Sequence, residues 1–262
     1  EARTVEDGSP DALLDAARSA RGARAARLYL QAAEALLEDD AEAASEALAA
    51  SDPAELSADD TARYLLIRAR LAIRAGRRGA AGAFEAARAD LTAIEDDRLD
   101  DPLAAALARA DLLAATGSER AAAEYLMAYR PDASDADVRQ RHSDAVWERL
   151  STVPPLVVVD AERSASGVHR GWWQLKAMMF QSFTLAEQQR RLAAWRASRP
   201  DHPASRHPPA ALSNLAEVSP ITRVGLMLPL SGNLSRAGRA VRDAFVATYL
   251  SHRDEVDFDV II

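Results

Sequence analysis

Apolar residues recur at helical spacing through the first two hundred residues of the chain. Successive runs place Ala and Leu every three or four positions, which is the pattern of helices with one buried face. These runs cover residues 12–20, 23–38, 41–50, 58–75, 80–94, 103–115 and 119–129. The turns near Asp39, Gly76 and Gly117 are roughly 40 residues apart, the scale on which stacked helix pairs repeat. The pattern therefore predicts an all-α solenoid of helical repeats.

Capping signals support several of these helix starts. Ser9 precedes a proline, Ser57 is followed three residues later by Asp60, and Ser134 is followed in the same way by Asp137. In outline the helix pairs resemble tetratricopeptide-like repeats. Their aromatic residues do not fall at one constant phase of the repeat, so the sequence leaves the repeat register open. These aromatics are Tyr29, Tyr64, Phe84 and Tyr125.

Three further segments follow the repeats. Residues 135–150 predict an amphipathic helix capped by Ser134, and the apolar residues 156–159 predict either a short strand or an apolar turn. A helix is then expected from Gly167, with a partner helix from about residue 185 to 199. The first of these carries Trp172 and Trp173, which lie about 100° apart around a helix. Either both belong to the core, or one lies at the surface as an anchor for a partner.

The pattern changes after Arg199. Four prolines within ten residues predict an extended, Pro-rich linker over residues 200–219, with one helical turn near residues 210–216. A short apolar run, a polar loop and an amphipathic helix follow over residues 223–250, and a second strand is expected over residues 258–262. We therefore expect a helical-repeat domain over residues 1–199, the linker, and the start of an incomplete α/β domain over residues 220–262.

Composition and charge narrow the classes of function. The chain has 262 residues, 48% of them hydrophobic but only 5% aromatic, so Ala and Leu must form most of the core. A formal net charge of -8 argues against nucleic acid as a partner, because phosphate binding needs a basic face. Lys176 is the single lysine, and we expect the many arginines to lie on solvated helix faces.

The sequence also bears on disulfides, thiolate metal sites and membrane anchoring. It contains no cysteine, which excludes disulfides and thiolate metal sites, and it has no apolar run of about 18 residues that could span a membrane. The numbering starts at Glu1 without a methionine, so we expect any targeting segment to have been removed or left out.

No motif predicts catalysis, a cofactor or a metal. Ser231 to Asn233 has the serine-x-asparagine pattern of penicillin-binding enzymes, but the partner motifs that those enzymes need are missing. The glycines 76, 79 and 82 lie between helices and predict a turn instead of a nucleotide site. His202 and His207 flank a Pro-rich loop without a third zinc ligand. The carboxylate pairs at residues 96–97 and 100–101 lie at helix ends, where they are expected to stay hydrated.

Three motifs together resemble one family. They are residues 170–175 (RGWWQL), residues 195–204 (WRASRPDHPA) and residues 223–232 (RVGLMLPLSG) leading into a helix. In this order and spacing they are similar to the penicillin-binding protein activator LpoA family. The resemblance implies that the whole protein is an outer-membrane lipoprotein. It would have an N-terminal tetratricopeptide-like domain and a C-terminal domain similar to type I periplasmic binding proteins. The resemblance also implies that most of that second domain lies beyond Ile262, and that the lipidated N-terminal cysteine is absent from this chain.

The resemblance implies a non-enzymatic regulator of peptidoglycan synthesis on the periplasmic face of the outer membrane. Its helical arm would position a C-terminal domain that binds and activates a bifunctional penicillin-binding protein; peptidoglycan itself is a further candidate partner. The candidate interaction residues are Trp172, Trp173 and the loop Leu230, Ser231, Gly232 and Asn233. The alternative is a periplasmic receptor for an amino acid, a peptide or a cell-wall fragment. A scaffold that binds peptide tails is the third reading, and the absence of Asn from the repeats counts against it.

Overall fold

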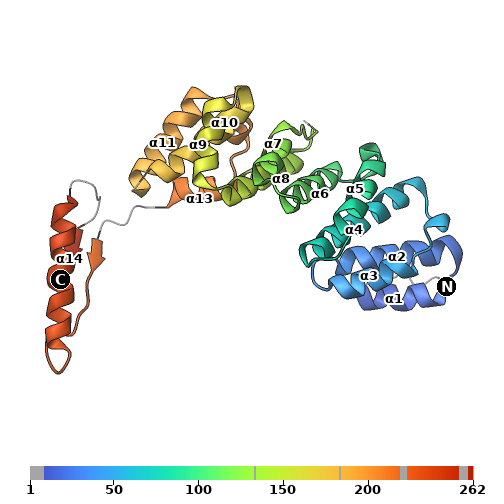
Figure 1. Cartoon of the computed structure of the whole chain (residues 1–262), viewed down its shortest axis with the longest axis horizontal. Coiled ribbons are helices and arrows are strands. Elements are labelled where there is room, and N and C mark those ends of the chain that lie inside the picture. Colours follow the sequence, from blue (N-terminus) through green and yellow to red (C-terminus); the bar gives the residue numbers. More distant parts are fainter. Residues whose placement is uncertain (1–8, 133, 183, 219–222, 254–258, 262) are drawn as a thin grey trace. The chain divides into compact units, whose positions relative to one another are not determined.

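The computed structural model describes residues 9–132, 134–182, 184–218, 223–253 and 259–261 (Figure 1). The chain divides into two compact units, Glu1–Val138 and Arg139–Ile262. None of the described helices is both long enough and apolar enough to cross a membrane.

Unit 1 consists of helices that pack in consecutive antiparallel pairs. Helix α1 packs on α2 and α2 on α3, while α4 pairs with α5 and α6 with α7. The bounds are α1 Pro10–Ser19, α2 Gly22–Leu36, α3 Ala41–Ala50, α4 Ala58–Arg77, α5 Ala83–Ala93, α6 Pro102–Ala115 and α7 Glu119–Ala128, with short 3-10 turns η1 Pro53–Glu55 and η2 Asp96–Arg98. The predicted all-α solenoid of helical repeats is confirmed.

Local capping explains where several helices of unit 1 begin. The hydroxyl of Ser9 accepts a hydrogen bond from the backbone N–H of Ala12, and Pro10 occupies the first turn of α1. The hydroxyl of Ser57 accepts from the backbone N–H of Asp60 at 3.1 Å and donates to the Asp60 carboxylate at 2.8 Å. The predicted cap at Ser57 is therefore confirmed.

Alanine and leucine form the core of unit 1, as the composition requires. One cluster joins α2, α3 and α4, and a second joins α4, α5 and α6. Several alanines are completely buried, and their small side chains let the helix backbones approach closely. These alanines include Ala32, Ala33, Ala44, Ala69, Ala87, Ala105 and Ala106.

Several arginines of unit 1 remain partly solvated, as expected, but they also pair with acids on neighbouring helices. Arg68 on α4 holds the buried carboxylate of Asp90 on α5 with two hydrogen bonds of 2.8 and 2.6 Å. Arg70 and Arg74, also on α4, both pair with Glu38 after α2. The long aliphatic stem of arginine can lie along one helix while its guanidinium reaches an acid on the next. Composition alone does not reveal such pairing.

Unit 2 begins with four helices, of which α10 packs on both α9 and α11. They are α8 Ala136–Thr152, α9 Pro155–Ser164, α10 Gly167–Gln181 and α11 Leu185–Ser198. Asp135 caps α8 by accepting from the backbone N–H groups of residues 137 and 138, so the predicted cap at Ser134 is wrong. Residues 156–159 are helical, and neither a strand nor an apolar turn forms. Pro155 is a favourable first residue for α9, and Val158 fills the core.

The extended backbone predicted after Arg199 is wrong where α12 forms, whereas the helical turn predicted near residues 210–216 is confirmed as α13. The described part of residues 200–219 forms these two short helices, α12 Pro203–Arg206 and α13 Ala210–Glu217. Side chains of α8 and α11 hold it: Gln140 donates to the Pro208 carbonyl at 2.9 Å, and Gln189 donates to the carbonyls of residues 215 and 218. Proline suits the first turn of a helix as well as an extended backbone, so proline content alone was ambiguous. The domain boundaries themselves stay a prediction.

The last described elements form a strand–helix–strand unit. Strands β1 Arg223–Gly225 and β2 Asp259–Ile261 pair in parallel, and α14 Ser235–Ser251 connects them. The register sets Val224 opposite Val260. This order agrees with the predicted strand, loop, helix and second strand, although Phe258 and Ile262 lie outside the described residues, as does the boundary near Ser219. That the unit begins a periplasmic-binding-protein-like domain stays a prediction.

Candidate functional site

The first candidate site is the loop Leu230 to Asn233, between β1 and α14. All four residues are exposed, Leu230 with 44% of its surface accessible. The chain just before the loop passes directly over α14, because Gly238 in the first turns of that helix has no Cβ to meet the backbone of Pro229. The loop is therefore held beside the N-terminus of α14, where backbone N–H groups can donate hydrogen bonds to a bound acceptor.

The second candidate, the tryptophan pair on α10, lies in the core of unit 2. Trp172 and Trp173 both have no exposed surface, so the alternative in which one of them is a surface anchor is wrong for this structure. The indoles avoid solvent although they point about 100° apart, because α10 is covered on more than one side. Helices α9 and α11 both pack on it.

His202 connects two of the sequence motifs that carry the family resemblance. Its ring lies edge-on to Trp172, with ring centroids 5.2 Å apart, and edge-on to Trp195 on α11 at 4.9 Å. It also covers Gly171, where a Cβ would lie 2.5 Å from two ring atoms. Arg199 adds a hydrogen bond of 2.6 Å to Gln174. Motifs that lie some thirty residues apart in the chain therefore form one packed cluster.

The hydrogen bonds of His202 indicate which ring nitrogen carries the hydrogen. The ring Nδ1 accepts from the backbone N–H of Ala204 at 3.1 Å, so Nε2 carries the hydrogen that faces the Val168 carbonyl at 3.0 Å. Burial lowers the pKa of His202; the carbonyl of Val168 opposes that shift and the charge of Arg199 adds to it. The neutral ring caps α12, and neither nitrogen is available to a metal.

This cluster predicts that unit 2 loses stability in mild acid. Because the folded-state pKa of His202 is lowered below its ordinary value of 6.5, the unfolded chain takes up a proton first as the pH falls. Stability is thus complete above about pH 6.5 and is lost progressively below it. The variant His202→Gln keeps a donor and an acceptor but cannot titrate. We expect a flatter dependence of its melting temperature on pH between about pH 7.5 and about pH 5.

A matched control for this pH experiment is His252→Gln, at the exposed end of α14. This variant should keep the slope of the parent. His207 contributes in the same direction as His202, since burial and the charges of Arg139 and Arg206 lower its pKa as well. Some slope therefore remains in His202→Gln. Equal slopes for His202→Gln and the parent would contradict the assignment.

The remaining sequence candidates are dispersed. Glycines 79 and 82 have positive φ angles in the turn between α4 and α5, as expected for a turn. His207 accepts from Arg139 at 2.9 Å. Within the described ranges, no group of three or more His, Asp or Glu side chains could hold a metal ion. Asp96 forms a bidentate pair with Arg109, so this carboxylate is bound, not simply hydrated.

Lys176 is a cation in an aromatic setting that the sequence did not reveal. Its Nζ lies 5.0 Å from the ring centroid of Trp147 and 5.1 Å from that of Phe180, and it donates to Ser151 at 3.2 Å. Burial lowers the pKa of its ammonium group. Ser151 in turn donates to the Trp147 carbonyl at 2.9 Å, so its hydroxyl hydrogen points away from Lys176. The contacts join α8 to α10 and do not form a nucleophile and base.

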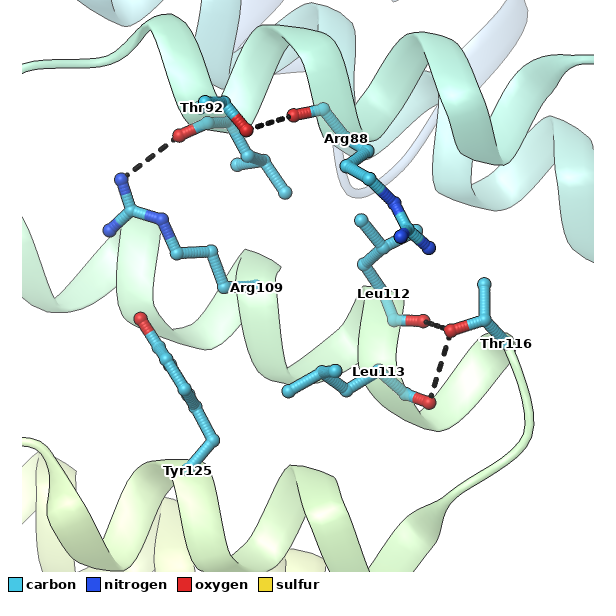
Figure 2. A pocket seen from close by; sticks show the side chains of 8 residues that line it. Arg88, Thr92, Arg109, Leu112, Leu113, Thr116 and Tyr125 are labelled. Carbon is cyan, nitrogen blue, oxygen red and sulfur yellow. Dashed lines mark hydrogen bonds between the residues drawn. The ribbon is translucent and has the colours of Figure 1, made fainter.

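A groove in unit 1 was also missed by sequence reasoning (Figure 2). It has a volume of about 430 Å³ and is open to solvent. Helices α5, α6 and α7 supply its lining, which consists of Arg88, Leu91, Thr92, Arg109, Leu112, Leu113, Thr116 and Tyr125. No short motif links residues on three helices, so only packing reveals the groove.

Comparison with known proteins gives one family. A family model described as LppC putative lipoprotein matches residues 6–260. A curated relative from Klebsiella pneumoniae, named penicillin-binding protein activator LpoA, is 30% identical over 174 residues, covering 63% of this chain and 24% of the relative. A protein of the same name from an Enterobacter species is 28% identical over 129 residues, covering 47% of this chain and 17% of that protein.

Solved structures agree on the fold. Full-length LpoA from Haemophilus influenzae superimposes with a TM-score of 0.66 at 19% identity, covering 100% of this chain and 47% of that one. The N-terminal domain of the same protein superimposes with a TM-score of 0.64 at 18% identity, covering 83% of this chain and 96% of the domain. The chain spans about a quarter of the length of the Klebsiella relative.

Proposed function

The chain belongs to the LppC lipoprotein family, and we propose that it is the helical arm of a lipoprotein regulator of peptidoglycan synthesis. In the whole protein, the arm positions a C-terminal domain that binds and activates a bifunctional penicillin-binding protein. Support for the activator role comes from the curated relatives, which are named penicillin-binding protein activators. The proposed location is the periplasmic face of the outer membrane, with a lipid anchor and with peptidoglycan as a further candidate contact.

One structural observation carries the proposal: helical repeats precede an α/β unit along the chain. Paired helices come first, and a parallel β1–α14–β2 unit comes last. Helical repeats are well suited to presenting a surface or another domain, because each repeat needs only its neighbours for stability. A regulator of this design acts by contact, so we propose no catalysis by the chain itself.

The loop Leu230 to Asn233 is the proposed contact point of the last unit. In parallel α/β sheets, ligands and partners meet the loops that follow the carboxyl ends of the strands. The loop follows β1 and is exposed. These properties suit contact with the penicillin-binding protein, which is the peptidoglycan synthase, or with a small ligand. In this proposal Trp172 and Trp173 do not contact a partner protein or a ligand directly, because both are buried.

The experiment compares three lipid-anchored forms of the full-length protein. One is intact, one lacks residues 9–218, because α12 and α13 pack on α8 and α11, and one carries an unrelated helical-repeat domain in their place. In solution with the purified synthase, we expect the intact and arm-deleted forms to stimulate glycan polymerisation and peptide cross-linking equally. In cells without the native protein, the arm-deleted form should fail and the replaced arm should restore growth.

The outcomes separate the activator role from the positioning role. If the purified intact protein neither binds nor stimulates the synthase, activation is excluded. If the arm-deleted form supports growth as well as the intact form, positioning by the arm is excluded. Thermal stabilisation by an amino acid or a cell-wall peptide, together with no effect on the synthase, would favour the alternative of a small-ligand receptor.

A further inference from the structure

The groove between α5, α6 and α7 contains an arginine that forms no ion pair within the described part of the chain. Its charged lining residues are Arg88 and Arg109. Arg109 is bound by Asp96 at 2.8 and 2.7 Å and by the Leu91 carbonyl at 3.0 Å; the hydrogen bond to Asp96 raises its pKa. Arg88 is exposed and forms no ion pair with another described residue. In a chain with a formal net charge of -8, the groove is thus a local site for an anion.

The threonine hydroxyls of the groove have already donated their hydrogens, so the guanidinium of Arg88 is the main donor left for a ligand. Thr92 already donates its hydroxyl hydrogen to the Arg88 carbonyl at 2.8 Å, and Thr116 donates its own to the Leu112 carbonyl at 2.8 Å. The guanidinium of Arg88 extends from α5 toward Leu112 and Thr116, and the hydroxyl of Tyr125 points toward Arg109 (Figure 2). The free N–H groups of Arg88 suit a carboxylate, which can only accept.

The floor of the groove is apolar. Leu91 and Leu112 are buried in the core of unit 1, and Leu113 beside them is half-buried. A volume of about 430 Å³ lies within the ordinary size range of ligand pockets and accommodates one or two side chains. The groove therefore matches a carboxylate carried next to an apolar group. Its open side would leave a free small molecule partly in water, whereas a peptide can add contacts beyond the groove.

We propose that this groove binds a peptide segment in which a glutamate or aspartate directly follows a leucine-like side chain. The apolar side chain lies on Leu91, Leu112 and Leu113. The carboxylate binds the guanidinium of Arg88. Arg109, held by Asp96, forms a fixed wall of the groove and does not compete for the ligand. This site belongs to the repeats and is independent of the contact between the C-terminal domain and a synthase.

The test measures peptide binding to the whole 262-residue chain by NMR titration with ¹⁵N labelling. The probe is the capped hexapeptide Gly-Ser-Leu-Glu-Ser-Gly. Its controls are the same peptide with Gln in place of Glu, and sodium 4-methylpentanoate as a free apolar carboxylate. We expect shifts confined to α5, α6 and α7 and to the side-chain N–H of Arg88, and weaker binding of both controls.

Variants then identify the residue that binds the carboxylate. Arg88→Gln should lower the association constant for the Leu-Glu peptide about tenfold, the effect of losing one charge-assisted hydrogen bond. It should leave the weak binding of the Leu-Gln peptide unchanged. The matched control Arg78→Gln removes an exposed arginine at the end of α4, outside the groove, and should bind as the parent does. Because Arg88 is exposed, its replacement leaves the core intact.

Several results would overturn the proposal. These are an absence of shifts up to about 5 mM peptide, shifts centred outside the three helices, or equal binding of the Gln peptide. Equal binding of 4-methylpentanoate would make the ligand a free carboxylate and not a peptide. Unchanged affinity in Arg88→Gln would remove the residue on which the site depends.

Discussion

Trp172→Ala is expected to lower the free energy of unfolding of unit 2 by about 3–5 kcal/mol, the usual cost of removing a fully buried aromatic side chain. Trp172 has no exposed surface and lies edge-on to His202. Its loss leaves a cavity beside the ring that caps α12, so α12 should loosen with it. The His202 ring also lies directly against Gly171, where a Cβ would be 2.5 Å from two ring atoms.

Hydrogen exchange is the appropriate measurement for Trp172→Ala, because the two units need not unfold together. Protection should fall in α10, α11 and α12 and should stay unchanged in α1 to α5. The matched control is Trp147→Ala on α8, the same chemical change at a half-buried indole, with a smaller expected loss. Equal losses in the two variants would contradict the central place of Trp172 in the core.

Arg68→Met is expected to destabilise unit 1 by about 2–3 kcal/mol, because it leaves the buried carboxylate of Asp90 without its partner. The Asp90 side chain is only 8% exposed and receives two hydrogen bonds from Arg68. The Arg68 side chain itself is 48% exposed, so water can reach part of the vacated site, and we place the loss below that of a fully buried pair.

Two further variants separate this buried pair from ordinary surface charge. Arg70→Met, two residues along α4, breaks a pair with Glu38, whose side chain is 63% exposed, and should cost less than about 1 kcal/mol. The double variant Arg68→Met with Asp90→Leu removes both charges and should recover most of the lost stability. Urea unfolding followed by far-UV circular dichroism would measure all three. A double variant as unstable as Arg68→Met would mean that packing of the Arg68 stem, and not the unpaired carboxylate, explains the loss.

Much of the fold could be predicted from sequence because its determinants are local. Helix positions depend on apolar spacing over three or four residues, and Ser57 caps α4 through residues directly beside it. The secondary-structure predictions were wrong where one local signal is compatible with two different structures. Residues 156–159 predict a strand or an apolar turn, and the prolines after Arg199 predict an extended linker, yet Pro155 opens α9 and Pro203 opens α12. Which of the two occurs is decided by whether a neighbouring surface can bury the resulting helix.

The candidate sites were far less predictable. The motif around Trp172 and the motif around His202 were recognised separately, and nothing in either indicates that His202 packs on Gly171. The groove that contains Arg88 and Tyr125 gave no signal at all, since its residues lie on three helices and their spacing follows no motif. A search for acidic and basic positions at matching places on successive repeats is the one approach that could have found the pairing of Arg68 with Asp90.

The helical repeats, the order of the helical part and the strand–helix–strand unit, and the family can all be recognised from sequence. These follow from periodicity, caps and motifs, which act over a few neighbouring residues. Only the tertiary structure decided that Trp172 and Trp173 are buried, that residues 203–217 fold against α8 and α11, and that Arg88 is left unpaired beside an apolar groove. Burial and pairing depend on which surfaces meet, and contacts between residues distant in the chain are set by packing geometry instead of local pattern.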